Sequence, residues 1–272
     1  MRRRFSLSGV TAVLTIAFLV APFVIVAGAS LDSAQSYTVR FPPRDLTLRW
    51  YGAIPAKYWD GLEVSVVLGA TVALLATALG VMAAFALVRG RLVGEQALRA
   101  FFRLPVQIPL VVTGAVFLQF YYYVVALAGV NPMNGLAGLV LAHLFIAMPY
   151  CVGAISAVMT RLDESLEEAA ESLGATAWAT FWQVTFPALR PGIVAGLLYA
   201  FIMSFGDVPI SIFLVNSDTM TFPVLAFQDM QADFNPGMLA VSTMVVVISL
   251  VLILVLQKVA GLDLVLPSRQ RG

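Results

Sequence analysis

Charged residues are scarce in this sequence of 272 residues. They make up 11% of the chain, whereas hydrophobic residues make up 60% and the mean hydropathy is +0.92. A soluble domain usually carries about 25% charged residues. The shortage of charge therefore excludes an ordinary soluble globular domain and indicates an integral membrane protein.

Cysteine and histidine are nearly absent, with only Cys151 and His143. One cysteine excludes a disulfide within the chain, and the two residues are too few for a Cys/His metal cluster. The net charge of +1, without a concentrated basic stretch, argues against nucleic-acid binding. The sequence also lacks the phosphate-binding, zinc-protease and serine-hydrolase motifs. We therefore expect no catalytic residues, metal or cofactor in this chain, and expect His143 to bond a neighbouring helix.

Long apolar stretches are abundant, and about 20 such residues suffice to cross roughly 30 Å of hydrocarbon as a helix. Six spans are predicted, at residues 9–29, 62–88, 105–128, 136–160, 192–216 and 237–262. We therefore expect an all-α, polytopic membrane protein with a single transmembrane domain over residues 1–272. Prolines at four positions predict kinks or breaks in the third, fourth and fifth spans: Pro105, Pro109, Pro149 and Pro209.

The basic residues predict the orientation of the chain. If the N-terminus is cytoplasmic, Arg40, Arg44, Arg49 and Lys57 lie outside, and the other twelve of the 16 lysines and arginines lie inside. Cytoplasmic segments are usually the basic ones, so both termini are predicted to be cytoplasmic. The first span is too long for a signal-peptide apolar region of about 7–15 residues, and we expect it to be an uncleaved anchor.

The segment 161–191, between the fourth and fifth spans, holds five carboxylates and two tryptophans. Its apolar residues recur at helical spacing and predict a short amphipathic helix: Leu162, Leu166, Ala169, Ala170 and Leu173. Gly174 suits the end of that helix, and Thr176 suits the N-cap of a second one. We expect Pro187 and Pro191 to stop the second helix before the fifth span.

Two explanations fit the tryptophans of this helical hairpin. They could form an aromatic belt at the membrane interface. The five carboxylates fit poorly beside an anionic leaflet, however. A protein partner that covers the hairpin explains both the acids and the aromatic residues.

The hairpin resembles the EAA loop of ABC importer permeases, whose pattern is EAA-x3-G-x9-I-x-LP. Here Glu168-Ala169-Ala170 is followed after three residues by Gly174, and after nine more by Val184, one residue, and Phe186-Pro187. Nearly the whole chain is similar to the second permease of spermidine/putrescine importers, in "FPPRDLTLRWY" (41–51), "AHLFIAMPY" (142–150) and "SFGDVPISIF" (204–213). The resemblance implies a type I importer permease with the MetI-like fold.

The resemblance also implies partners and contact residues. The partners are a second permease subunit, two ATP-binding subunits that hold ATP and Mg, and an extracytoplasmic solute-binding protein, all in or at the bacterial inner membrane. The residues expected to contact the ATPase are Glu167, Glu168, Ala169, Ala170, Gly174, Trp178 and Pro187. The acidic loop residues Asp229 and Asp233 are expected to meet the binding protein.

A substrate pathway is predicted around Asp207, the one carboxylate well inside an apolar span. This carboxylate either contacts a cationic substrate or forms a hydrogen bond between helices. We place Ser204 in the same pathway, together with Tyr121, Tyr122 and Tyr123, whose rings could stack on ammonium groups. A polyamine is the expected substrate. A phosphonate, an opine or an amino-acid derivative remains open, as does a self-sufficient secondary transporter.

Overall fold

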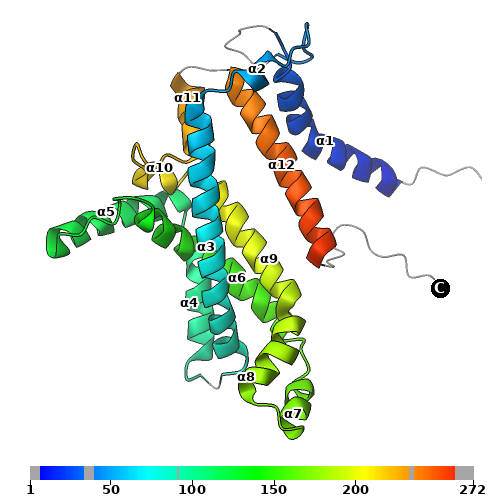
Figure 1. Cartoon of the computed structure of the whole chain (residues 1–272), viewed down its shortest axis with the longest axis vertical. Helices are drawn as coiled ribbons and strands as arrows, with labels where there is room; N and C mark the ends of the chain where they lie inside the picture. The colour runs from blue at the N-terminus through cyan, green and yellow to red at the C-terminus, as the bar shows by residue number, and fades with distance from the viewer. Residues whose placement is uncertain (1–6, 34–39, 91, 233–235, 261–272) are drawn as a thin grey trace, which may run out of the picture. The chain divides into compact units, whose positions relative to one another are not determined.

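The computed structural model describes residues 7–33, 40–90, 92–232 and 236–260, with side chains at 9–33, 40–90, 92–232 and 236–251. The described chain is almost entirely helical (Figure 1). Its helices are α1 Leu7–Ala29, α2 Arg49–Gly52, α3 Ala56–Val88, α4 Glu95–Gln107, α5 Leu110–Ala128, α6 Ala137–Met159, α7 Ser165–Ser172, α8 Ala177–Thr180, the π-helix η1 Phe181–Thr185, α9 Phe186–Phe205, α10 Ser211–Leu214, α11 Phe222–Ala232 and α12 Pro236–Ala260.

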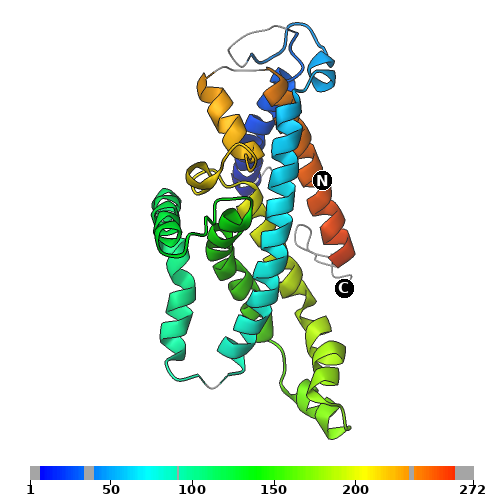
Figure 2. The ribbon, with the colours of Figure 1, turned by 60° about the vertical axis from the view of Figure 1, so that its left-hand side comes forward.

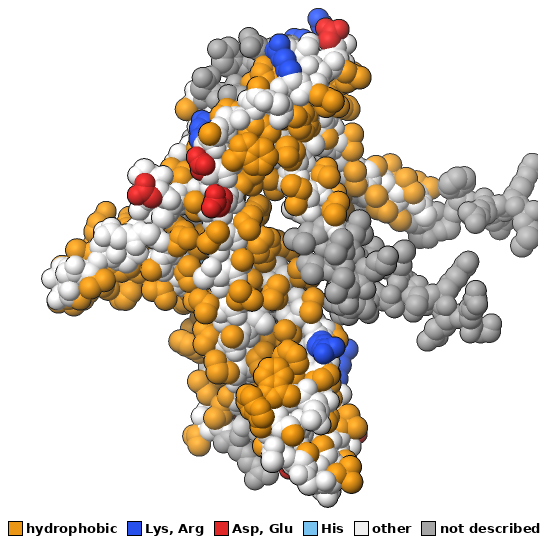
Figure 3. All heavy atoms as spheres, in the orientation of Figure 1, with side chains coloured by type: hydrophobic (Ala, Val, Ile, Leu, Met, Phe, Trp, Pro, Cys, Tyr) orange, Lys and Arg blue, Asp and Glu red, His pale blue; other side chains and the backbone are white. Residues whose placement is uncertain are grey.

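Five of the described helices are long and apolar enough to cross a membrane. They are Gly9–Ala29, Ala56–Val88, Leu110–Ala128, Ala137–Met159 and Ala177–Phe205. The apolar helix α12 stands at the place of the sixth predicted span. Hydrophobic side chains are spread over the visible face of the described chain and charged ones are few (Figure 3), as expected for segments that face lipid or other membrane helices. The predicted all-α, multi-span fold is confirmed.

Three of the predicted spans differ in their boundaries from the described helices, and the second, expected at 62–88, already begins at Ala56. The third was expected to begin at residue 105, but α4 continues through Pro105 to Gln107 and α5 begins only after Pro109. The two helices leave this break in different directions (Figures 1 and 2). The fifth span was expected at 192–216, whereas the continuous helix covers Ala177–Phe205 and ends at Gly206, before Pro209.

Contacts within the chain divide it into two units, one of residues 1–59 and 226–257, the other of residues 60–225 and 258–272. The first unit contains the link that follows α1. There Asp32 and Leu46 form an isolated antiparallel bridge, and the Trp50 indole N–H donates to the Asp32 carbonyl over 2.8 Å. Ser30 and Tyr51 share a hydrogen bond of 2.7 Å, which holds the end of α1 against α2.

The core of the second unit is formed by α3, α6 and α9. Its fully buried residues include Val72 of α3, Ile146 of α6 and Ala200 of α9. Helices α6 and α9 approach each other closely at Gly192 and Gly196, where an added Cβ would lie 3.0 Å from the Ala154 carbonyl oxygen and 3.2 Å from the Cys151 Cα. Two glycines four residues apart are a common device for close helix packing in membranes.

Candidate functional site

The turn between α7 and α8 has the conformation that the sequence predicts. Gly174 has a φ of +89°, and its N–H donates to the Glu171 carbonyl, while the Ala175 N–H reaches back to Ala170. These two bonds close the end of α7 as a Schellman motif, which favours glycine because of the positive φ. Thr176 then begins α8, its hydroxyl accepting from the Ala179 N–H over 3.3 Å.

Much of the apolar surface of α7 is uncovered within the described chain. Leu173 is 90% exposed and Leu166 is 51% exposed, although both belong to the predicted apolar face. Glu168 and Ala169 of the EAA motif are also exposed. A short amphipathic helix gains little from an apolar face that stays in water, so a partner surface is the expected cover.

An aromatic cluster lies at the second arm of the hairpin. The Trp178 ring stacks on Phe181 at 6.3 Å between centroids and meets Trp182 edge to face at 5.6 Å. Phe181 in turn lies 5.7 Å from Phe85 of α3. Trp178 is nevertheless 71% exposed. The cluster is therefore packed against α3 through Phe181, while the Trp178 ring remains accessible.

Arg89, directly after α3, binds residues of the hairpin, a role that the sequence alone did not indicate. Its guanidinium forms ion pairs with Glu164 and, at 3.6 Å, with Glu167, and it donates to the Leu162 carbonyl over 3.3 Å. Glu167 also accepts a 2.6 Å hydrogen bond from the Thr185 hydroxyl. Glu167 therefore links both arms of the hairpin to α3. In the sequence, a basic residue at the end of an apolar span indicates only the orientation of that span, and it does not indicate which carboxylates the residue will pair with.

At the start of α7, the hydrogen bond from the Ser165 backbone N–H lowers the pKa of Asp163. Its carboxylate accepts this N–H over 3.0 Å. Asp163 therefore stays ionised beside the positive end of the helix, which favours negative charge.

The expected stop at Pro187 and Pro191 is wrong. Helix α8, the π-helix η1 and α9 form one continuous helix over Ala177–Phe205. In η1 the Phe186 N–H bonds to the Phe181 carbonyl, five residues back. Pro187 is the second residue of α9, just after η1, and Pro191 lies inside α9. The change of hydrogen-bonding register lies directly before Pro187, whereas Pro191 is accommodated within the α-helical segment α9.

A buried polar cluster joins α6 to the end of α9. His143 Nδ1 lies 2.8 Å from the Ser204 hydroxyl, and Nε2 lies 3.1 Å from the Ser211 hydroxyl. Asp207 Oδ2 accepts from the backbone N–H of Ile210 (3.1 Å) and from the N–H and hydroxyl of Ser211 (2.8 and 2.9 Å). The Asp207 carboxylate thus caps α10 and lies 3.6 Å from the His143 Nε2.

The other predicted pathway residues fall in two environments. Tyr121 is buried, and its hydroxyl donates to the Gly138 carbonyl over 2.7 Å, whereas Tyr122 and Tyr123 are exposed on α5. Ser204 and Asp207 are both buried in the polar cluster, with 2% and 5% of their surface exposed. The described structure therefore does not bring the tyrosines and Asp207 together around one open cavity.

In the first unit, Asp229 already has two partners. Its carboxylate lies 2.6 Å from the Lys57 ammonium group and accepts a 2.6 Å hydrogen bond from the Tyr58 hydroxyl. This arrangement joins the first turn of α3 to α11. Asp233, the other residue expected to meet a binding protein, lies outside the described residues.

The described site and helices are those of a membrane-embedded transport subunit with an exposed hairpin. Residues 76–261 match the family of binding-protein-dependent transport system inner membrane components, and the chain belongs to this family. It is therefore a multi-pass inner membrane permease subunit of an ABC importer, as the EAA pattern indicated. The alternative of a self-sufficient secondary transporter does not fit this family.

The chain is similar to individual members as well. It is 31% identical to the putrescine transport system permease protein PotI of Escherichia coli K12 over 231 residues, which are 84% of this chain and 81% of that protein. The PotI protein of Escherichia coli O6:H1 matches equally. Among solved structures, a bacterial ABC transporter involved in import of the acidic polysaccharide alginate superposes with a TM-score of 0.66 at 18% identity, covering 95% of this chain and 98% of that one. This last likeness concerns the fold.

Proposed function

We propose that this permease subunit carries a polyamine, putrescine or a close relative, into the cytoplasm by alternating access. The observation that carries the proposal is the 31% identity to a putrescine permease over 84% of the chain. Polyamines are small flexible cations, and the subunit needs only transient contacts with them, since tight binding would slow release.

The α7–α8 hairpin is the proposed docking surface for an ATP-binding subunit. The exposed tips of Leu173 and Trp178 support this role, because large apolar side chains at an interface centre commonly dominate binding. ATP and Mg would bind the separate ATPase chain, so this chain would contribute no catalytic group and no cofactor site. Arg89 would transmit movement of the docked hairpin to α3.

The proposed assembly contains a second, different permease subunit, two ATP-binding subunits and an extracytoplasmic solute-binding protein. Both termini and the hairpin would face the cytoplasm. We expect α1 to pack against lipid or another subunit, because its side chains Val13, Leu14 and Phe18 are all largely exposed within this chain.

A substrate path along α5 is proposed on chemical grounds. The exposed rings of Tyr122 and Tyr123 can attract an ammonium group through cation–π contacts. Asp207 would act at a distance, since its carboxylate is occupied by the N-terminal groups of α10. A cation could reach Asp207 only after α10 moves away from it.

The test is uptake by the complete transporter in proteoliposomes, supplied with its binding protein outside and ATP inside. We expect ATP-dependent uptake of radiolabelled putrescine or spermidine, with weak competition by phosphonates, opines, amino acids or uronate oligosaccharides. Titration of the binding protein alone with the same solutes would give the order of affinities. Preference for an anionic solute in both measurements would refute the polyamine assignment and leave the permease assignment intact.

A further inference from the structure

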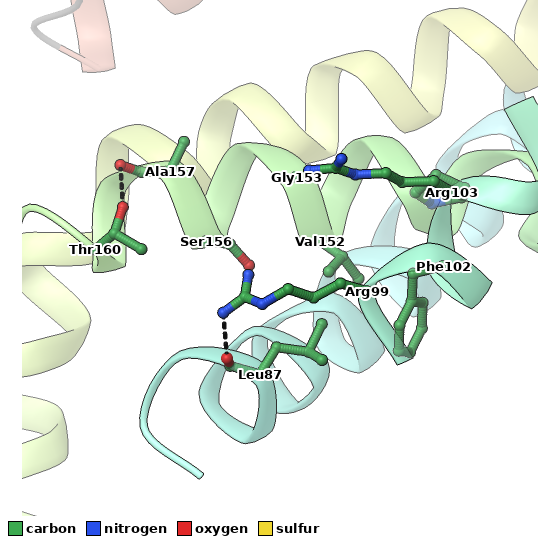
Figure 4. A pocket seen from close by; sticks show the side chains of 10 residues that line it. Leu87, Arg99, Phe102, Arg103, Val152, Gly153, Ser156, Ala157 and Thr160 are labelled. Atoms are coloured by element: carbon green, nitrogen blue, oxygen red, sulfur yellow. Dashed lines mark hydrogen bonds between the residues drawn. The ribbon is translucent and has the colours of Figure 1, made fainter. Parts of the chain in front are cut away.

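A pocket of about 260 Å³ lies between α4, the end of α3 and α6 (Figure 4). Its polar lining consists of Arg99 and Arg103 from α4, Ser156 from α6 and Thr160 directly after α6. The remaining lining residues are apolar or small: Leu87, Phe102, Pro149, Val152, Gly153 and Ala157. Two arginines therefore share a half-apolar pocket with two hydroxyl groups.

The pocket has more donors than acceptors. The Arg99 guanidinium bonds to Glu95 through Nε (2.7 Å) and to the Leu87 carbonyl through Nη2, and its Nη1 has no further partner among the described residues. Arg103 forms no ion pair or hydrogen bond with the described part of the chain. The buried Ser156 hydroxyl likewise lacks a partner there. Among the described residues, Glu95 is the one carboxylate paired with these two arginines. The pocket therefore keeps a positive charge and unused donors, which is the chemistry of a phosphate site.

Apolar surface surrounds these donors on the outer side of α4. Phe101, Leu104 and Val106 are all about half exposed or more. A helix with arginines on one face and large apolar side chains on the rest suits the boundary between headgroups and acyl chains. A soluble phosphate compound would gain nothing from this apolar border, whereas a phospholipid would bury it.

The pocket is also at the same end of the second unit as the hairpin. The pocket residue Thr160 directly follows α6, and α7 begins five residues later. Arg89, two residues beyond the pocket residue Leu87, holds Glu164. An occupant of the pocket would therefore contact the elements on which the hairpin is mounted.

We propose that this pocket binds the phosphate of an anionic phospholipid, with Arg99 and Arg103 as its ligands and the border of α4 against its acyl chains. Basic pockets between membrane helices commonly select such headgroups. The bound lipid would brace α4 against α6 beneath the hairpin.

The experiment uses the assembled complex in detergent, incubated with phosphatidylglycerol or phosphatidylcholine and analysed by native mass spectrometry. We expect the native complex to retain phosphatidylglycerol in preference to phosphatidylcholine. The double substitution Arg99→Gln and Arg103→Gln should lower retention about thirtyfold, because each basic residue contributes an attraction of about 1 kcal/mol and about 1.4 kcal/mol corresponds to a factor of ten. Arg190→Gln, which removes an exposed arginine outside the pocket, is the matched control and should leave retention unchanged.

A second variant tests the pocket without changing charge. A Cβ added at Gly153 would meet no atom within 4 Å, so Gly153→Leu can fill the pocket without a clash in the helix. We expect it to lower phosphatidylglycerol retention, with Gly153→Ala as its small control. Equal retention by the double arginine variant and the native complex would overturn the proposal. Displacement of the lipid by millimolar inorganic phosphate or glycerol phosphate, with the same dependence on the arginines, would show a site for a soluble phosphate and overturn the lipid assignment.

Discussion

Arg89 Nη2 lies 3.6 Å from Glu167 Oε2, so the end of α3 is tied to the first helix of the hairpin by a half-buried ion pair. Glu167 is at the same time bonded to Thr185 at the base of the second arm. Glu167 thus connects both arms of the hairpin to the end of α3, beside the Arg89–Glu164 ion pair, while the outer residues of the hairpin stay accessible.

Loss of this ion pair should loosen the hairpin. We predict that Arg89→Gln lowers the local stability of residues 163–175 by about 1 kcal/mol, since the pair is partly exposed. Backbone amide exchange in this segment should then be about fivefold faster. Hydrogen exchange by mass spectrometry measures this change, and Arg161→Gln is the control, because Arg161 forms no ion pair with the described residues. Equal exchange in the two variants would contradict the mounting role.

The turn at Gly174 should tolerate no Cβ, for conformational reasons alone. An added Cβ at Gly174 would meet no atom within 4 Å, but φ is +89°. We predict that Gly174→Ala destabilises the hairpin by about 1–2 kcal/mol. Gly153→Ala has equal free space without a positive φ, and it should cause no loss. Limited proteolysis of the purified complex compares the two, and equal cleavage rates would rule out the strain argument.

Trp178 should contribute to ATPase binding and little to folding. Because 71% of its surface is exposed, we predict that Trp178→Ala leaves the melting temperature of the permease unchanged. The affinity for the ATP-binding subunit should fall at least about tenfold, as is usual for a tryptophan at an interface centre. Trp59→Ala, at an exposed tryptophan of α3, is the control. Undiminished ATPase binding by the Trp178 variant would place the docking surface elsewhere.

Substitutions of Asp207 should distinguish two roles of its carboxylate, which are capping of α10 and attraction of a cationic substrate. Asp207→Ala leaves two buried backbone N–H groups, those of Ile210 and Ser211, without their acceptor, and should destabilise the permease by about 2 kcal/mol. Asp207→Asn keeps an acceptor oxygen and should preserve assembly. If the negative charge assists a cationic substrate, the asparagine variant should still lower polyamine uptake. Uptake at the native level in a fully assembled Asp207→Asn complex would assign this residue to the cap alone.

The features predicted well from sequence are those whose cause is local. The membrane helices follow from apolar composition over about 20 residues. The Gly174 turn and the Thr176 cap follow from the conformations that these residues favour at helix ends.

The features that sequence could not supply depend on distant partners or on register. His143 and Ser204 are 61 residues apart, and no local pattern joins them. The ion pairs of Arg89 with the hairpin are equally remote in sequence. Pro187 was expected to end a helix because an α-helical register leaves its ring without room. The five-residue hydrogen-bond spacing of η1 directly before Pro187 relieves that conflict, and the positions of prolines in the sequence do not predict a π-helix.

The uninterrupted helix Ala177–Phe205 has a mechanical consequence. Its 29 residues span about 43 Å at about 1.5 Å per residue. Trp178 stands at one end, and the other end is Phe205, directly before Gly206 and the Asp207 cap. A displacement of Trp178 can therefore reach the Asp207 cap along one continuous helix, and the places along it that can bend are η1, Pro191 and the segment Gly206–Pro209.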